Sequence, residues 1–316
     1  MRAFVTGVGG QDGSYLAEDL LAAGYEVDGL VAPGIPCSPP AGVRLHEGDL
    51  ADADAMAALL ADVAPDQVYN LAGVSSVALS WEQPVLTAQV NAVGAIGLME
   101  AAWRVQQASR RRVAFVQAGS AEMFGEPASA PQHEGTPIQP VNPYGVSKAF
   151  AHQAVAVYRA RGLAASSLIL YNHESPRRPT SFVTRKITAG VAAIAQGRAT
   201  ELTLGNLDAR RDWGWAPDYA RAMRLAAEHP HPADYVIATG ESHSVRDLVR
   251  IAFAHVGIAD WERYVRVDPT FIRPADATEL CGDSSAARRV LGWAPSVTFE
   301  QVVEAMVTHD LDVGQA

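Results

Sequence analysis

The sequence predicts an α/β protein built on a doubly wound parallel sheet, with a smaller C-terminal lobe. Three observations lead to this prediction. In the first half, short apolar or β-branched runs alternate with longer segments of helical period, as parallel strands and crossover helices do. A glycine-rich turn joins the first such run to the first helical segment. Beyond about residue 172 the alternation loosens and prolines become frequent, which is typical of return segments that form a second lobe.

The elements of the first half can be placed in order from their apolar runs. Strands are expected at Ala3–Thr6, Glu26–Val31, Gln67–Leu71, Val113–Gln117 and Ser166–Leu170. Helices are expected at residues 12–23, 53–62, 84–108 and 143–161. The last helix follows Asn142-Pro143, because proline suits a first helical turn. With right-handed crossovers, these elements give one domain over residues 1–171, supplemented by later return segments, and a lobe over residues 172–316.

The composition is that of a folded globular protein. Hydrophobic residues make up 48% of the 316 residues and charged residues 19%, and we expect no apolar stretch long enough to span a bilayer. The chain reaches Gly7 before a signal peptide could form, so a cytoplasmic location is expected. Cys37 and Cys281 lack metal-ligand spacing, which predicts two reduced thiols and no metal site.

The charge is acidic overall and basic in one segment. A net charge of -10 argues against nucleic-acid binding. Residues 173–211 nevertheless hold seven cations against three anions, an excess that suits a small phosphorylated ligand. The alternative is a set of arginines that are merely solvated. The cations are Arg177, Arg178, Arg185, Lys186, Arg198, Arg210 and Arg211.

The glycine-rich turn predicts a Rossmann-type dinucleotide site. Its glycines are Gly7, Gly10 and Gly13, and it also contains Gln11 and Asp12. Glycine is needed there because the turn is tight, the backbone must approach a pyrophosphate closely, and the helix must present free N–H groups. The end of the second strand, residues 31–33, has neither the acidic residue typical of NAD binding nor the arginine typical of NADP binding.

A second constellation predicts carbonyl chemistry. Tyr144 and Lys148 lie four residues apart on one helix face, where the lysine charge is expected to lower the pKa of the phenol and make tyrosinate available as a base. Ser120, at the end of the fourth strand, can hydrogen-bond the same substrate hydroxyl. Glu122 is not needed for simple oxidation. A carboxylate there can remove a proton from the carbon beside a newly formed ketone.

Several longer blocks give these motifs a family context. The sequence resembles the GDP-mannose 4,6-dehydratases, which are extended members of the short-chain dehydrogenase superfamily. The resemblance covers nearly the whole chain and is most specific in the Asn-His-Glu-Ser-Pro and Phe-Val-Thr-Arg-Lys-Ile segments. The matching blocks are residues 119–125, 131–137, 143–144, 172–178, 182–187, 204–207, 211–214, 235–240 and 291–293.

This resemblance implies binding residues and a cofactor, NADP, with NAD as the alternative. Asp49 and Leu50 would flank the adenine, while Leu71, Ala72 and Gly73 would pass behind the cofactor, which Tyr144 and Lys148 also contact. The C-terminal lobe would bind a GDP-sugar. The implied substrate contacts are Asn172, Glu174, Ser175, Val183, Arg185, Lys186, Leu204, Asn206, Arg211 and Arg273. Four of them resemble the family's contacts to the nucleotide diphosphate, namely Arg185, Asn206, Arg211 and Arg273.

The resemblance also implies the reaction. Tyr144 would deprotonate the C4 hydroxyl of GDP-mannose as hydride leaves C4, and Glu122 would then remove the C5 proton. Water would be lost across C5–C6, and hydride would return to C6, giving GDP-4-keto-6-deoxymannose and restoring the cofactor. At residue 121, where the family typically has serine, the chain has Ala121.

Two alternative functions and the oligomeric state remain undecided at this point. A GDP-hexose epimerase or 4-keto-reductase would use the same scaffold without elimination, and a non-catalytic nucleotide-binding protein would need neither Tyr144 nor Lys148. Residues 31–43 lack the Arg-Arg-Ser-Ser-Ser motif and the longer loop with which family members form tetramers. We therefore expect a homodimer, with a tetramer as the alternative, and no nucleic-acid or membrane partner.

Overall fold

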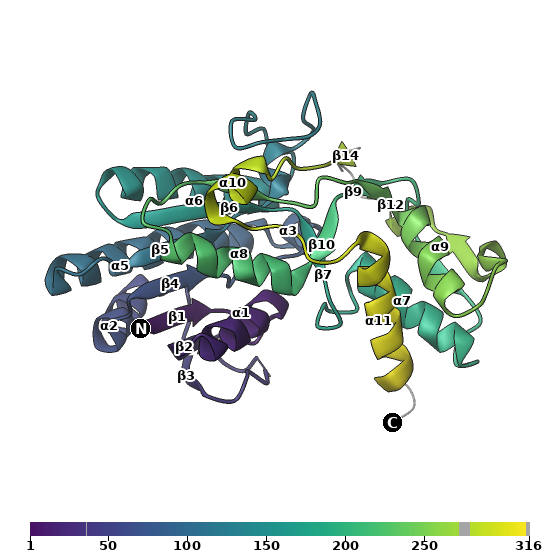
Figure 1. Ribbon diagram of the computed structural model, residues 1–316, viewed down its shortest axis with the longest axis horizontal. Coiled ribbons are helices and arrows are strands. Elements are labelled where there is room, and N and C mark those ends of the chain that lie inside the picture. Colours follow the sequence, from purple (N-terminus) through teal and green to yellow (C-terminus); the bar gives the residue numbers. More distant parts are fainter. Residues whose placement is uncertain (36, 272–278, 314–316) are drawn as a thin grey trace.

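The computed structural model describes residues 1–35, 37–271 and 279–313, so the predicted contact Arg273 lies outside the described residues. A seven-stranded parallel sheet forms its centre, with the strand order β11-β6-β5-β4-β1-β2-β3 (Figure 1). This is the Rossmann-type doubly wound sheet that the sequence predicts. Its strands are β1 (Arg2–Thr6), β2 (Glu26–Val31), β3 (Val43–Glu47), β4 (Gln67–Asn70), β5 (Ala114–Ala118), β6 (Ala164–Leu170) and β11 (Tyr235–Ile237).

Two strands of this sheet are absent from the strand predictions, for different reasons. The edge strand β3 is mostly exposed and carries Arg44, His46 and Glu47, so its sequence lacks the apolar run of a buried strand. Strand β11 is apolar but has only three residues, and it comes from the second half of the chain to pair with β6. The segment thus returns to the first domain, which local sequence patterns do not reveal.

Helices cover both faces of the sheet. On one face lie α1 (Gln11–Ala22), α8 (Ala216–Glu228) and α10 (Ser285–Leu291), and on the other α2 (Ala53–Val63), α5 (Ala95–Ser109) and α6 (Pro143–Ala160). Along β1, Ala3 and Val5 enter the first core and Phe4 the second. This alternation follows from the period of two in a strand and buries both faces of the sheet.

The helix expected at residues 84–108 is interrupted. Helix α3 (Val77–Glu82) precedes α4 (Pro84–Ala88), and a π-helical segment, η1 (Gln89–Gly94), leads into α5. The 26-residue stretch from Pro84 to Ser109 is long and apolar enough to cross a membrane, so the expectation that no such stretch exists is wrong. Half of the most apolar part is buried inside the molecule, where α5 packs against α2 and α6, as in a core helix.

The C-terminal lobe has its own hydrophobic core between α7 (Val183–Ala195), α9 (Val245–His255) and α11 (Phe299–Val313), at the right of Figure 1. Short strands frame it: β7 (Asn172–Glu174), β8 (Leu202–Leu204), β9 (Arg210–Arg211), β10 (Trp213–Trp215), β12 (His243–Ser244), β13 (Val265–Val267) and β14 (Glu279–Leu280). The remaining elements are the 3₁₀ turns η2 (Ala121–Phe124), η3 (Trp261–Tyr264) and η4 (Pro269–Phe271).

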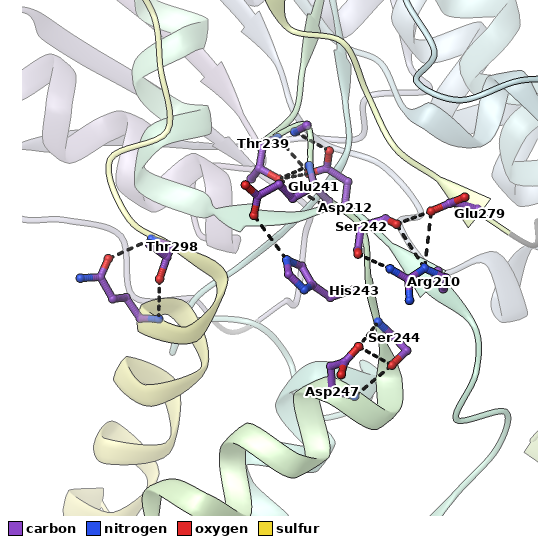
Figure 2. A network of polar contacts seen from close by, with 12 residues as sticks. Arg210, Asp212, Thr239, Glu241, Ser242, His243, Ser244, Asp247, Glu279 and Thr298 are labelled. Atoms are coloured by element: carbon purple, nitrogen blue, oxygen red, sulfur yellow. Dashed lines mark hydrogen bonds and ion pairs between the residues drawn. The ribbon is translucent and has the colours of Figure 1, made fainter.

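A buried carboxylate ties three segments of this lobe together (Figure 2). Asp212 is fully buried, and its Oδ1 accepts hydrogen bonds from the amide and the hydroxyl of Thr239 at 2.9 and 2.7 Å. Its Oδ2 accepts from the amides of Gly240 at 2.9 Å and Gly282 at 3.3 Å. Both oxygens of the Asp212 carboxylate thus accept hydrogen bonds from groups that come close to Asp212 only after the chain has folded.

Candidate active site

The glycine-rich turn leaves space and free donors at the carboxyl ends of the strands. Gly7 has φ +68°, which favours glycine, and a Cβ on Gly13 would lie 2.2 Å from the Gly7 carbonyl oxygen. Helix α1 begins at Gln11 after Gly10, which provides no side-chain cap. A helix N-terminus without a cap, following a turn that only glycine permits, fits the pyrophosphate of a dinucleotide.

The loop after β4 is held beside this turn. The Thr6 hydroxyl accepts hydrogen bonds from the amides of Leu71 at 3.0 Å and Ala72 at 2.9 Å. A Cβ on Gly73 would lie 2.6 Å from the Asn91 side-chain oxygen, so glycine is needed there. Asn91 comes from the π-helical segment, bonds both the amide and the carbonyl of Val74, and was not identified from the sequence. A buried asparagine in an otherwise apolar helix is the signal that could have revealed it.

The predicted adenine contacts follow β3. Leu50 is buried against the π-helical segment, where a Cβ on Gly94 would lie 2.9 Å from its Cγ. Asp49 is exposed, and its Oδ1 accepts a hydrogen bond from the Ala51 amide at 2.9 Å. The assignment of both residues to the adenine stays a prediction.

A polar bridge joins the start of α1 to the segment after β6. The Gln11 side chain donates to the His173 carbonyl at 3.1 Å and accepts from the Ser175 hydroxyl at 2.8 Å. Asp12 Oδ2 lies 2.9 Å from His173 Nε2. Although burial opposes the shift, the charge and hydrogen bond of His173 lower the pKa of Asp12 to about 2, and Asp12 raises the pKa of His173. Sequence reasoning did not assign this role to His173.

The predicted catalytic trio lies where β5 ends and α6 begins. Ser120 follows β5, and its hydroxyl hydrogen-bonds Tyr144. Lys148, one turn further along α6, donates from Nζ to the Ala118 carbonyl at 2.9 Å and lies 5.7 Å from the centre of the Tyr144 ring. The structure therefore brings the three predicted side chains to one edge of the sheet.

Burial dominates the electrostatics of this trio. It raises the pKa of Tyr144 to about 12, against the opposing hydrogen bond from Ser120, and it lowers the pKa of Lys148 to about 8. The expectation that the lysine charge would lower the pKa of the phenol is therefore wrong for the protein alone, because the cost of removing a charge from water exceeds the local attractions.

The predicted base Glu122 is anchored from the start of α6. It lies in the 3₁₀ turn η2, which begins one residue after Ser120. The Ser120 hydroxyl accepts a hydrogen bond from the Glu122 amide at 3.2 Å. Its Oε2 accepts from Asn142 Nδ2 at 2.9 Å. The Glu122 charge also opposes ionisation of Tyr144, which places the two groups in one electrostatic environment. Sequence reasoning used Asn142 only to mark the start of a helix.

Several predicted substrate contacts are already engaged within the lobe. Glu174 is buried, accepts from the Thr184 hydroxyl at 2.6 Å and lies 3.4 Å from Arg178 Nε. Arg185 forms an ion pair with Asp310 in α11 and donates from Nε to a backbone carbonyl. These contacts fix the first turn of α7, and a diphosphate would have to share Arg185 with Asp310.

The other predicted contacts of the lobe lie in varied settings. Asn172 begins β7, Val183 begins α7, and Leu204 ends β8 as a buried residue. Lys186 Nζ lies 4.1 Å from the centre of the Phe271 ring; Asn206 is exposed; and Arg211 is buried and donates to the Arg210 carbonyl at 2.7 Å. Their assignment to a nucleotide sugar stays a prediction.

The fold and the site together define a class of protein, the extended short-chain dehydrogenases. The defining features are the Rossmann-type sheet, the uncapped helix after the glycine turn, and the Ser120–Tyr144–Lys148 trio. Within this class the chain belongs to the GDP-mannose 4,6 dehydratase family, whose model matches residues 4–306. The sequence-based assignment to this family is confirmed.

Relatives and solved structures agree with this assignment. GDP-mannose 4,6 dehydratase 1 of Arabidopsis thaliana is 45% identical over 99% of this chain and 90% of its own length. The Vibrio cholerae GDP-mannose 4,6-dehydratase is 40% identical over 99% of this chain and 94% of its own. The Thermus thermophilus UDP-glucose 4-epimerase, solved with NAD, is 30% identical over 98% of this chain and 99% of its own, with a TM-score of 0.86.

A second solved structure shows the other nicotinamide cofactor. The RMD protein of Pseudomonas aeruginosa, complexed with NADPH, is 26% identical over 99% of each chain, with a TM-score of 0.82. The prediction of a nicotinamide cofactor is thus confirmed for this group of enzymes.

Proposed function

We propose that the protein is a GDP-mannose 4,6-dehydratase that converts GDP-mannose to GDP-4-keto-6-deoxymannose. The observation that carries this proposal is the Glu122 carboxylate, held beside the Ser120–Tyr144 pair by a neutral amide. Oxidation at C4 needs no such base, whereas elimination across C5–C6 does. The relatives bearing this name extend over nearly the whole chain and support the same choice.

The site fits a nicotinamide dinucleotide at the glycine turn and along the loop that contains Ala72 and Gly73. When bound, the cofactor accepts hydride from C4 and later returns it at C6. NADP is our proposal, with NAD as the alternative, because the resemblance to the family implies it; the end of β2 has neither an acidic residue nor an arginine to favour one cofactor. Titrating the protein with each cofactor tests this choice, and tighter binding of NAD would overturn it.

The first step belongs to Tyr144. Its phenolate, a minor form because burial raises the pKa of Tyr144 to about 12, takes the proton of the C4 hydroxyl, while Ser120 hydrogen-bonds the same oxygen and holds it against the phenol. Lys148, fixed by its bond to the Ala118 carbonyl, stabilises the phenolate while its ammonium is charged. The product of this step is a ketone at C4, which makes the C5 proton acidic.

The second step belongs to Glu122. Its carboxylate takes the C5 proton, and the C6 hydroxyl leaves as water, because the resulting C5–C6 double bond is conjugated with the ketone. The two protons collected by Tyr144 and Glu122 balance the two that the products require, one in the released water and one at C5.

A mass measurement tests the proposal. GDP-mannose incubated with the protein and catalytic NADP is expected to give a product lighter by one water, with no net NADPH. An unchanged mass with an altered sugar configuration would instead select a GDP-hexose epimerase, and net formation of NADPH with a sugar lighter by two hydrogens would select a 4-keto-reductase running in reverse. Parallel incubations with other GDP-sugars, including a GDP-heptose, identify the preferred hexose.

We also propose that the protein is a homodimer that associates through an exposed apolar face. Side chains of α3, α4, η1 and α6 form this face, and helices α4 and α6 pack side by side. A contiguous apolar patch on the surface of a protein commonly marks a site where another protein binds. The most exposed residues of the face are Trp81, Val85, Leu86, Val93, Val146, Phe150 and Val157, which are 43 to 69% accessible.

Sedimentation of paired variants tests the dimer. Phe150→Glu is expected to give monomers, because a charge would be buried at the interface, while Leu45→Glu on β3 should leave the assembly unchanged. Leu45 is the matched control, since both residues are 45% exposed in the single chain. A Phe150→Glu variant that sediments like the wild type would remove this face from the interface, and a wild-type mass of four chains would select the tetramer.

We propose a cytoplasmic location for the protein. Cys37 and Cys281 are both free thiols, a state that reducing compartments maintain. Fractionation of cells that produce the protein checks this proposal, and recovery with the membrane fraction would contradict it.

A further inference from the structure

Several contacts hold Glu122, and two of them come from the start of α6. The Ser120 hydroxyl accepts from its amide at 3.2 Å. A Cβ on Gly145 would lie 2.5 Å from the Glu122 carbonyl oxygen, so the helix backbone packs directly against the Glu122 backbone. The third contact is the hydrogen bond from Asn142 to the carboxylate. The orientation of the base is therefore set largely by the helix that carries Tyr144.

Asn142 uses both ends of its amide for this purpose. Its Oδ1 accepts from the Gly145 amide at 2.8 Å as the N-cap of α6, and its Nδ2 donates to Glu122 Oε2 at 2.9 Å. Only 3% of the residue is exposed, so water cannot readily replace either bond. The cap fixes the amide plane, and the amide plane fixes the carboxylate.

The choice of a neutral donor matters for the chemistry. A lysine or arginine partner would favour the charged form of a carboxylate and weaken it as a base, whereas a carboxamide orients it without adding charge. Glu122 Oε1 has no hydrogen-bond partner among the residues that the structure describes and is not enclosed. One oxygen is thus anchored and the other is left for proton transfer.

We infer that Asn142 is a positioning residue for the C5 proton transfer: it aims Glu122 Oε1 at the sugar and couples the base to the helix that carries Tyr144. This inference rests on the proposed function. Residue 121 adds to the demand on Glu122, because a buried alanine offers neither a hydroxyl nor a carboxyl to the leaving group. Placement of the single carboxylate then governs the elimination, while oxidation at C4 depends on Tyr144 and Ser120.

Asn142→Ser separates the two bonds of Asn142, because serine keeps a helix cap but cannot supply the amide donor. In single turnovers with GDP-mannose and NADP, this variant is expected to lose water about tenfold to hundredfold more slowly, as a misplaced catalytic group does. NADPH should then accumulate transiently, since C4 oxidation continues. Asp52→Ser is the matched control: Asp52 caps α2 through the Ala55 amide at 3.0 Å, and this exchange should leave turnover unchanged.

A second variant gives a readout that altered folding alone would not produce. Asn142→Asp keeps the cap oxygen and places a negative charge beside Glu122. The acid limb of its pH–rate profile for water loss should move to higher pH, because a neighbouring like charge favours protonation of a carboxylate. An unshifted profile would contradict the inference.

The outcomes distinguish this inference from the proposed function. If the wild type loses no water from GDP-mannose, the proposed function fails and the inference fails with it. If the wild type dehydrates and Asn142→Ser matches its rate, or slows NADPH formation and water loss equally, only the role of Asn142 is overturned. Thermal unfolding of each variant confirms that the folded protein is compared.

Discussion

Two carboxylates, one in each lobe, are held in opposite ways. Asp212 is fully buried and accepts four hydrogen bonds, so both of its oxygens are committed to the C-terminal lobe. Glu122 is partly exposed and accepts a bond from a neutral amide. A saturated carboxylate stabilises the loops around it. A carboxylate with one free oxygen remains available to take a proton, and this contrast locates the chemistry in the first lobe.

The buried cation Lys148 belongs to the catalytic side of this comparison. It donates a hydrogen bond to the Ala118 carbonyl, and burial lowers its pKa to about 8. Burial also raises the pKa of Asp212, against its hydrogen bonds from Thr239, Gly240 and Gly282, so both buried groups cost stability while they are charged. Four donors offset part of this cost at Asp212, whereas the catalytic edge leaves groups incompletely satisfied, as function requires.

The largest expected effect is on turnover. Glu122→Gln should lower the rate of water loss roughly a thousandfold, because the amide cannot act as a base. Binding of GDP-mannose and the midpoint of thermal unfolding should stay close to the wild-type values. Product mass spectrometry and calorimetry measure these quantities, and an undiminished rate would exclude Glu122 as the base.

The complementary change should act on stability. Asp212→Ala leaves the buried amides of Thr239, Gly240 and Gly282 without their acceptor, which should lower the free energy of unfolding by about 3 to 4 kcal/mol. Turnover per folded molecule is expected to change much less than in Glu122→Gln. Urea unfolding monitored with activity tests this, and a loss of activity without a loss of stability would reverse the roles of the two carboxylates.

The buried lysine predicts a trade of activity for stability. Its lowered pKa costs folding free energy at pH 7, where the ammonium is charged in both states, and this cost disappears as the pH rises from about 8 to 10.5. Lys148→Met should be inactive yet about 2 to 3 kcal/mol more stable at pH 7, allowing for the lost hydrogen bond. The advantage should shrink above pH 8. Urea unfolding of the variant and the wild type at pH 7 and above pH 8 measures this difference. A variant that is less stable than the wild type at pH 7 would contradict the prediction.

The smallest effect is expected at the bridge between the lobes. The lowered pKa of Asp12 contributes stability that is present above pH 3.8 and is lost as the pH falls toward 2. The raised pKa of His173 contributes below pH 6.5 and is lost as the pH rises through its folded value. Asp12→Asn should therefore cost about 2 kcal/mol, most clearly between pH 4 and 6.5. Acid titration of unfolding checks this window, and a deficit independent of pH would exclude the ion pair as its cause.

Much of the first lobe could be predicted from the sequence by itself. The period of apolar residues placed five central strands and four helical segments, since a strand or helix buried on the sheet must show its own period. The glycine turn and the Tyr144–Lys148 spacing located the catalytic edge, because both depend on residues that are neighbours along the chain. The family assignment followed from blocks of the same kind.

Only the tertiary structure decided the features that join distant segments. Strand β11 pairs with β6 so that Tyr235 lies opposite Leu168, and the Asp12–His173 bridge spans 161 positions, so no local pattern announces either one. The same holds for the bond from Asn142 to Glu122. Burial, too, raises the pKa of Tyr144, where the spacing to Lys148 led us to expect a lowered one, and it lowers the pKa of Lys148 against the charge of Asp12. Desolvation depends on everything packed around a group and not on its neighbours in the sequence.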